Sequence, residues 1–65
     1  MTLAQFLNAL DGKDIVITVL EPSGDNIIKF YSGTTALDDA LESREIRKIR
    51  LVGASAIDIF LNSAE

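Results

Sequence analysis

The sequence predicts an α+β fold in which a four-stranded, mainly antiparallel sheet carries two helices on one face. Three observations lead there: apolar side chains repeat with helical spacing at the start of the chain, two later stretches alternate around short turns, and an acidic, helix-like segment separates these two hairpins. The expected order is helix, strand, strand, helix, strand, strand. With 65 residues, the chain has room for a single domain, residues 1–65.

The first helix has a recognisable beginning and end. Thr2 and Gln5 have the spacing of a capping box, in which each side chain bonds to the backbone amide of the other residue. The next apolar residues fall on one helical face: Leu3, Phe6, Leu7 and Leu10. Asp11-Gly12 is expected to end the helix, because glycine accepts the left-handed conformation common at helix C-termini.

Two strand-like runs follow, Asp14 to Leu20 and Asn26 to Ser32, around the loop Glu21 to Asp25. Pro22 and Gly24 suit a tight turn, so the two runs are expected to pair as a hairpin. Both runs are apolar on one face and mostly apolar on the other, which is typical of a strand covered on both sides.

The second half of the chain is expected to repeat the helix and hairpin. Gly33 is expected to break the strand, and Thr34 or Thr35 can cap a helix after it. Asp38 and Asp39 would stabilise the first turn of this helix, because negative charge is favourable at the positive end of the helix dipole. The segment Arg44 to Leu51 then has two interpretations. It either continues this helix or forms a strand, and the strand is preferred because a helix would scatter its apolar residues around the circumference. A turn at Gly53-Ala54-Ser55 leads to the last strand.

Once the helices cover one face of the sheet, the other face needs an explanation. Its expected members are apolar or aromatic for the most part and form the predicted partner or homodimer interface: Val16, Thr18, Leu20, Ile27, Tyr31 and Phe60. Small domains often gain stability by oligomerising, so a homodimer through this face is expected. Whether a second copy or another protein covers it is left open by the sequence.

Charge is unevenly distributed along a chain whose net charge is −4. A basic cluster is a candidate contact for nucleic acid or protein, or a protected sheet edge: Arg44, Arg47, Lys48 and Arg50. The net negative charge disfavours nucleic acid. An acidic contact is predicted on the second helix, with Glu45 as an optional fourth member: Asp38, Asp39 and Glu42.

The composition favours a non-catalytic protein. The chain has no His and no Cys, so its serines lack the usual activating base, and adjacent Asp38 and Asp39 point about 100° apart on a helix rather than converging. No cofactor, metal site or membrane span is predicted, and a cytoplasmic location is expected.

Four features together resemble the short phage and mobile-element proteins of Gram-positive bacteria. They are the opening Thr2 to Leu7 helix, the Ile15 to Val19 strand, the Gly33 break before an acidic helix, and Arg44-Glu45-Ile46 leading to Ile57-Asp58-Ile59. Arg47 stands where such proteins carry apolar residues. The resemblance implies a protein-binding role in a bacterial host, as an inhibitor of a host defence protein. The alternatives are a nucleic-acid-binding accessory protein and a structural phage component.

Overall fold

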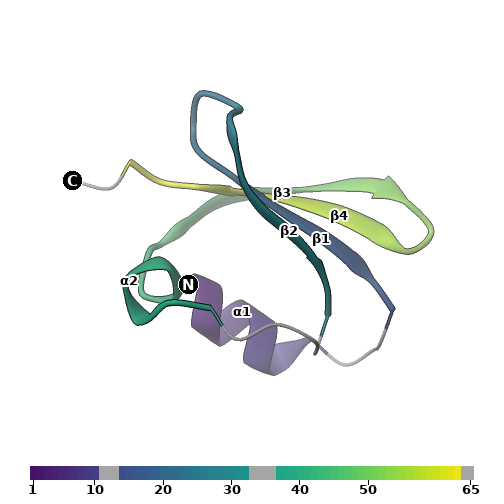
Figure 1. Ribbon diagram of the computed structural model, residues 1–65, viewed down its shortest axis with the longest axis horizontal. Helices are drawn as coiled ribbons and strands as arrows, with labels where there is room; N and C mark the ends of the chain where they lie inside the picture. The colour runs from purple at the N-terminus through teal and green to yellow at the C-terminus, as the bar shows by residue number, and fades with distance from the viewer. Residues whose placement is uncertain (11–13, 33–36, 64–65) are drawn as a thin grey trace.

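The structure, a computed structural model, describes residues 1–10, 14–32 and 37–63, and it is an α+β fold with a four-stranded sheet and two helices (Figure 1). The elements in chain order are α1 (Leu3–Ala9), β1 (Val16–Leu20), β2 (Asn26–Tyr31), α2 (Asp39–Glu42), β3 (Ile46–Gly53) and β4 (Ala56–Leu61). An isolated antiparallel bridge joins Thr2 to Glu45 ahead of α1. The named helices and strands follow the predicted sequence, but this bridge adds a strand-like pairing ahead of α1, so the order is not exactly helix, strand, strand, helix, strand, strand.

The sheet is mixed, so the expectation of a mainly antiparallel sheet is wrong. Its strand order is β2-β1-β4-β3, with two antiparallel hairpins on the outside and a parallel pair, β1 and β4, in the centre. A parallel pair needs a long crossover rather than a turn, and the segment containing α2 and β3 supplies it. Side-chain alternation predicts which face a residue occupies, but it does not predict which strands become neighbours.

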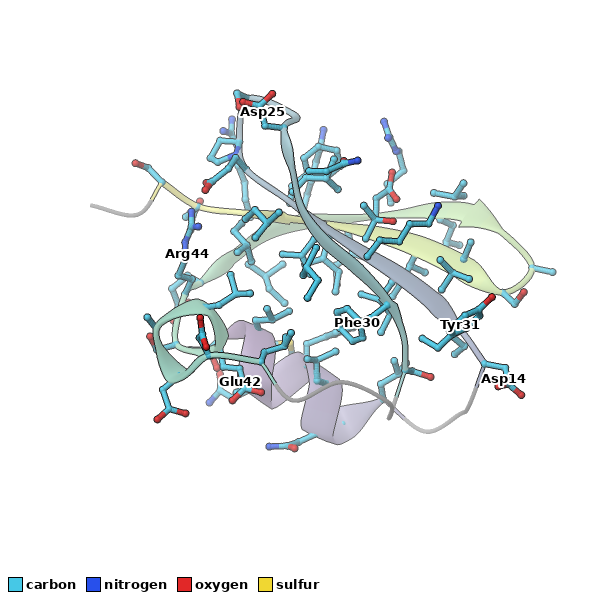
Figure 2. All side chains as sticks on the ribbon, viewed as in Figure 1. Asp14, Asp25, Phe30, Tyr31, Glu42 and Arg44 are labelled. Atoms are coloured by element: carbon cyan, nitrogen blue, oxygen red, sulfur yellow. The ribbon has the colours of Figure 1, made fainter. Side chains whose placement is uncertain are left out.

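The core lies between the sheet and α1, and both helices lie on the same side of the sheet (Figure 1). Phe30 points from β2 toward this side (Figure 2). The buried cluster draws on α1 and on the three strands β1, β2 and β4: Leu3, Ile17, Val19, Phe30, Ile57, Ile59 and Leu61. The predicted apolar face of α1 packs against this cluster, although only Leu3 is fully buried.

The start of α1 has the predicted capping box. The Gln5 backbone N–H donates to the Thr2 hydroxyl at 3.2 Å, and the Thr2 backbone N–H donates to Gln5 Oε1 at 2.8 Å. Leu10 forms the C-cap, in an extended conformation. The predicted end at Asp11-Gly12 lies outside the described residues, as do the Gly33 break and the caps proposed at Thr34 and Thr35.

The segment of uncertain type is a strand, as the preferred interpretation predicted. β3 runs from Ile46 to Gly53 and pairs along β4, so the second helix does not continue through Arg50. α2 is a single turn of four residues with Asp38 as its N-cap. The turn between β3 and β4 falls at Ala54 and Ser55, within the predicted one.

The N-terminal residues are attached to the beginning of β3. The Leu3 N–H donates to the Arg44 carbonyl and the Ile46 N–H donates to the Met1 carbonyl, both at 2.9 Å. The Met1 ammonium group also lies 3.1 Å from a Glu45 carboxylate oxygen. These contacts place Met1, Thr2 and Leu3 beside the start of β3, on the edge that does not pair with β4.

Candidate functional site

The open face, the side of the sheet away from the helices, carries five of the six residues predicted for the partner interface. Along β1, Val16, Thr18 and Leu20 alternate with the core residues Ile17 and Val19. The strand register then adds two residues opposite this row: Tyr31, which pairs with Val16, and Phe60, which pairs with Leu20.

Ile27 does not belong to this row. The register of β1 and β2 shifts between Val19 and Leu20, so Ile28 pairs with Val19 while Asn26 pairs with Leu20. This β-bulge leaves Ile27 unpaired and redirects its side chain. Ile27 lines an open cavity toward α2, together with Asp38, Ala40, Leu41 and Arg44.

Much of the apolar surface on the open face is already covered by the chain itself. Leu20 is 7% exposed and Phe60 is 9% exposed. The Lys48 ammonium lies 4.8 Å from the centroid of the Phe60 ring, and the Arg50 guanidinium carbon lies 5.2 Å from it. These cation–π contacts lay the stems of both basic side chains over Phe60. Tyr31 remains 55% exposed. Since Leu20 and Phe60 are already covered, a partner would bury less apolar area on the open face than the sequence predicts.

The open face is predominantly basic. In the row across the sheet, Lys29 pairs with Thr18, Thr18 with Asp58, and Asp58 with Arg50. Arg50 donates to Asp58 at 2.8 Å, and Lys48, two residues before Arg50 on β3, lies on the same face. Three cations therefore share this surface with one carboxylate, which makes it attractive to an anionic partner.

Arg44 is separate from the other predicted basic residues. It precedes β3 and donates two hydrogen bonds to the carboxylate of Glu21, at 3.1 and 2.8 Å, and a third to the Asn62 carbonyl. Its side chain runs from the end of α2 toward the β1–β2 turn (Figure 2). The hydrogen bonds and charge of Arg44 lower the pKa of Glu21, and those of Glu21 raise the pKa of Arg44. Arg44 is thus an internal clamp between the ends of β1 and β4.

The predicted acidic contact is reduced to one helical turn. Asp38 and Asp39 are exposed at the start of α2. Glu42, which is labelled in Figure 2, is half-buried at the end of the same turn. Glu45 lies beyond the helix and pairs with the N-terminus. The structure therefore brings Asp38 and Asp39 together at the surface but offers no extended acidic helix face.

A third surface, which the sequence interpretation missed, lies on β3. The β3 surface consists of Ile49, Leu51 and Val52. Ile49 and Leu51 pair with the core residues Ile59 and Ile57 and lie on the helix side of the sheet, whereas Lys48 and Arg50 lie on the open face, at the same sheet edge. The three apolar side chains are 42%, 80% and 58% exposed, in that order. The β3–β4 hairpin extends past the helices, so neither helix covers this end of the sheet (Figure 1). The sequence contains the alternation of apolar and basic residues that marks this surface, but only the structure shows that the strand lies at a sheet edge.

Arg47, the fourth predicted basic residue, is exposed where the register of β3 and β4 shifts between Ile46 and Lys48. Among the described residues, no group of three or more Asp, Glu, His or Cys side chains is placed to hold a metal ion. Neither of the two described helices has the length and apolar character needed to cross a membrane.

Comparisons of this chain with protein-family models, with curated proteins and with solved structures find no match.

Proposed function

We propose that this chain is a non-catalytic module that binds another protein through the β3 surface. One observation carries the proposal: Ile49, Leu51 and Val52 expose 42%, 80% and 58% of their area on neighbouring positions of an edge strand. Large apolar side chains exposed near one another on a surface are typical of protein interaction sites. The absence of His and Cys from the sequence supports a role without catalysis.

The partner's surface is expected to be acidic around an apolar centre. Lys48 and Arg50 lie on the same strand as the exposed apolar residues but on the other face of the sheet, so a partner at the edge of β3 meets both kinds of side chain. Complementary charge raises the rate of encounter and suppresses contact with basic proteins. The charge of the open face disfavours a homodimer through it, because each copy would present three cations and one carboxylate to a surface of the same charge.

The biological setting is proposed from the sequence resemblance to phage and mobile-element proteins. A small module with an exposed binding surface suits an inhibitor that blocks a host defence protein. A structural phage component would use the same surface for another phage protein. The two settings differ in the origin of the partner rather than in the chemistry of the contact.

The test is affinity capture from a Gram-positive host that carries a defence system, using the protein with a C-terminal tag. Leu51→Asp should remove a stoichiometric partner, because it places a charge at the most exposed apolar position. Tyr31→Asp is the matched control, since Tyr31 is also exposed but lies on the open face. Equal recovery of the same proteins by both variants would contradict the proposal. Restored defence with Leu51→Asp but not with Tyr31→Asp would favour the inhibitor setting.

A second candidate function, binding of single-stranded nucleic acid, is favoured by the open face. Tyr31 is an exposed aromatic residue on the same strand as Lys29, and aromatic side chains beside cations stack on bases. Phe60 is not free to stack, because Lys48 and Arg50 lie over its ring. Fluorescence anisotropy with a labelled oligonucleotide at low salt tests this candidate. Binding should weaken steeply with added salt and should be lost with Tyr31→Asp.

A further inference from the structure

We infer that β3 accepts an extended segment of a partner protein as a fifth strand, and that this segment alternates acidic and apolar side chains. The inference rests on the proposed protein-binding function and specifies how the β3 surface is used. It commits to strand addition at the sheet edge, in which backbone hydrogen bonds supply affinity and alternate side chains supply specificity.

The edge itself is accessible. β3 is the last strand of the sheet, and within the described part of the chain its outer side is paired only at its start, by Met1 and Leu3. Charged side chains often protect such edges by projecting over them. Here, Lys48 and Arg50 instead lean inward over Phe60 of β4. The two side chains thus border the free edge without blocking it.

The existing partner of β3 indicates what a second strand should look like. On its inner side, β3 pairs with β4, where Ile49 faces Ile59, Arg50 faces Asp58 and Leu51 faces Ile57. Apolar residues thus meet on one face of the sheet while a carboxylate meets a cation on the other. A strand added at the outer side would share these two faces, so its apolar side chains would lie beside Ile49 and Leu51 and its acidic side chains on the face of Lys48 and Arg50. A strand alternating isoleucine-like and aspartate-like residues fits this pattern.

A second copy of β3 fits this edge poorly when the two strands overlap along most of their length. In an antiparallel pair of β3 strands centred on Ile49, Lys48 of each copy would lie opposite Arg50 of the other. Like charges directly opposite each other destabilise a strand pair. Charge complementarity therefore points to an acidic strand from a different protein.

The test is a titration of the full chain with three capped peptides, each eight residues long to match β3. The first alternates isoleucine and aspartate, the second replaces aspartate with lysine, and the third is the first peptide methylated at every backbone nitrogen. Binding is followed by chemical shifts and hydrogen exchange of the backbone amides. The acidic peptide should shift and protect amides of β3, with at least about tenfold weaker binding by both other peptides.

Further variants sharpen the result. Lys48→Glu should narrow or reverse the preference for the acidic over the lysine peptide, whereas Lys29→Glu, on the far strand β2, should leave it unchanged. Strand addition is overturned by equal binding of the methylated peptide, by shifts confined to Lys29 and Tyr31, or by no shift at about 1 mM peptide. Light scattering that shows a dimer with β3 protected would also overturn it, in favour of a second copy.

The failure of this inference can be told apart from failure of the proposed function. If the peptides do not add to β3 but capture of a partner still depends on Leu51, the binding function stands and strand addition is wrong. If capture does not depend on Leu51 either, the proposed function falls with it.

Discussion

Ile49 and Ile59 are cross-strand partners of the same residue type in opposite environments, so they provide a matched test of the β3 surface. Ile59 is 0% exposed and belongs to the core, whereas Ile49 is 42% exposed. Replacing each by valine removes the same methylene group. The difference between the two losses in unfolding free energy should therefore report the difference in burial alone.

The expected magnitudes follow from these environments. A fully buried methylene contributes about 0.8 kcal/mol, and the small cavity left behind gives Ile59→Val an expected cost of about 0.5–1.5 kcal/mol. Ile49→Val should cost less than about 0.5 kcal/mol, as exposed substitutions usually do. Valine is preferred to alanine because a chain of 65 residues has roughly 3–10 kcal/mol of total stability, and a core alanine at about 2–5 kcal/mol would approach that limit.

Urea unfolding followed by circular dichroism measures both variants. Ile59→Val should lower the midpoint with an unchanged slope, and for a domain of this size a loss of 1 kcal/mol corresponds to roughly 4–8 °C in Tm. Equal losses for the two variants would refute the reasoning, since Ile49 would then be as covered in solution as Ile59. Adding the acidic peptide should stabilise the wild type more than Ile49→Val.

Three further predictions concern local contacts. Arg44→Gln should return the Glu21 pKa, measured by NMR titration, toward its ordinary value of 4.5. Because Arg44 lowers that pKa in the folded state, the contact between Arg44 and Glu21 stabilises the wild type above pH 4.5. This contribution to the free energy of unfolding is lost as the pH falls through the lowered pKa. Thr2→Ala should cost about 1 kcal/mol in urea unfolding by removing the oxygen that accepts the Gln5 amide, whereas Thr2→Ser should be nearly neutral. Gly24→Ala should destabilise the fold by about 1 kcal/mol in urea unfolding, because Gly24 has φ +100°. The added methyl group meets no atom within 4 Å beyond the two adjacent residues, so a neutral effect would mean that the turn relaxes.

The local parts of the fold were predictable because their causes lie close together in the sequence. Thr2 and Gln5 are three residues apart, and their capping box is present as expected. The apolar and basic alternation of β3 likewise distinguished a strand from a continued helix. In both cases, the spacing of side chains along the chain decides the backbone conformation.

The parts that failed depend on contacts between distant residues. Parallel pairing of β1 with β4 is a property of the crossover between hairpins, and no local pattern encodes it. The bulge that moves Ile27 off the open face depends on the register between β1 and β2. Arg44 was grouped with its sequence neighbours, but Glu21, 23 positions away, determines its role.

The exposed surface was harder to predict than the core. Phe60 was expected to need a partner, but Lys48 and Arg50 from the next strand cover it. Leu51 pairs with the buried Ile57, yet it is 80% exposed, because the β3–β4 hairpin extends past the helices (Figure 1). Which apolar residues stay exposed depends on how far the helices extend over the sheet, and α2 has only four residues.

The bridge between Thr2 and Glu45 has a practical consequence for work with this protein. Because the pairing is antiparallel, residues fused before Met1 would be directed along β3, opposite the residues that follow Ile46. Such a fusion would compete for the edge at an effective concentration on the order of millimolar. A purification tag belongs at the other end of the chain for this reason. A deliberately acidic N-terminal extension would serve as a tethered inhibitor of the module.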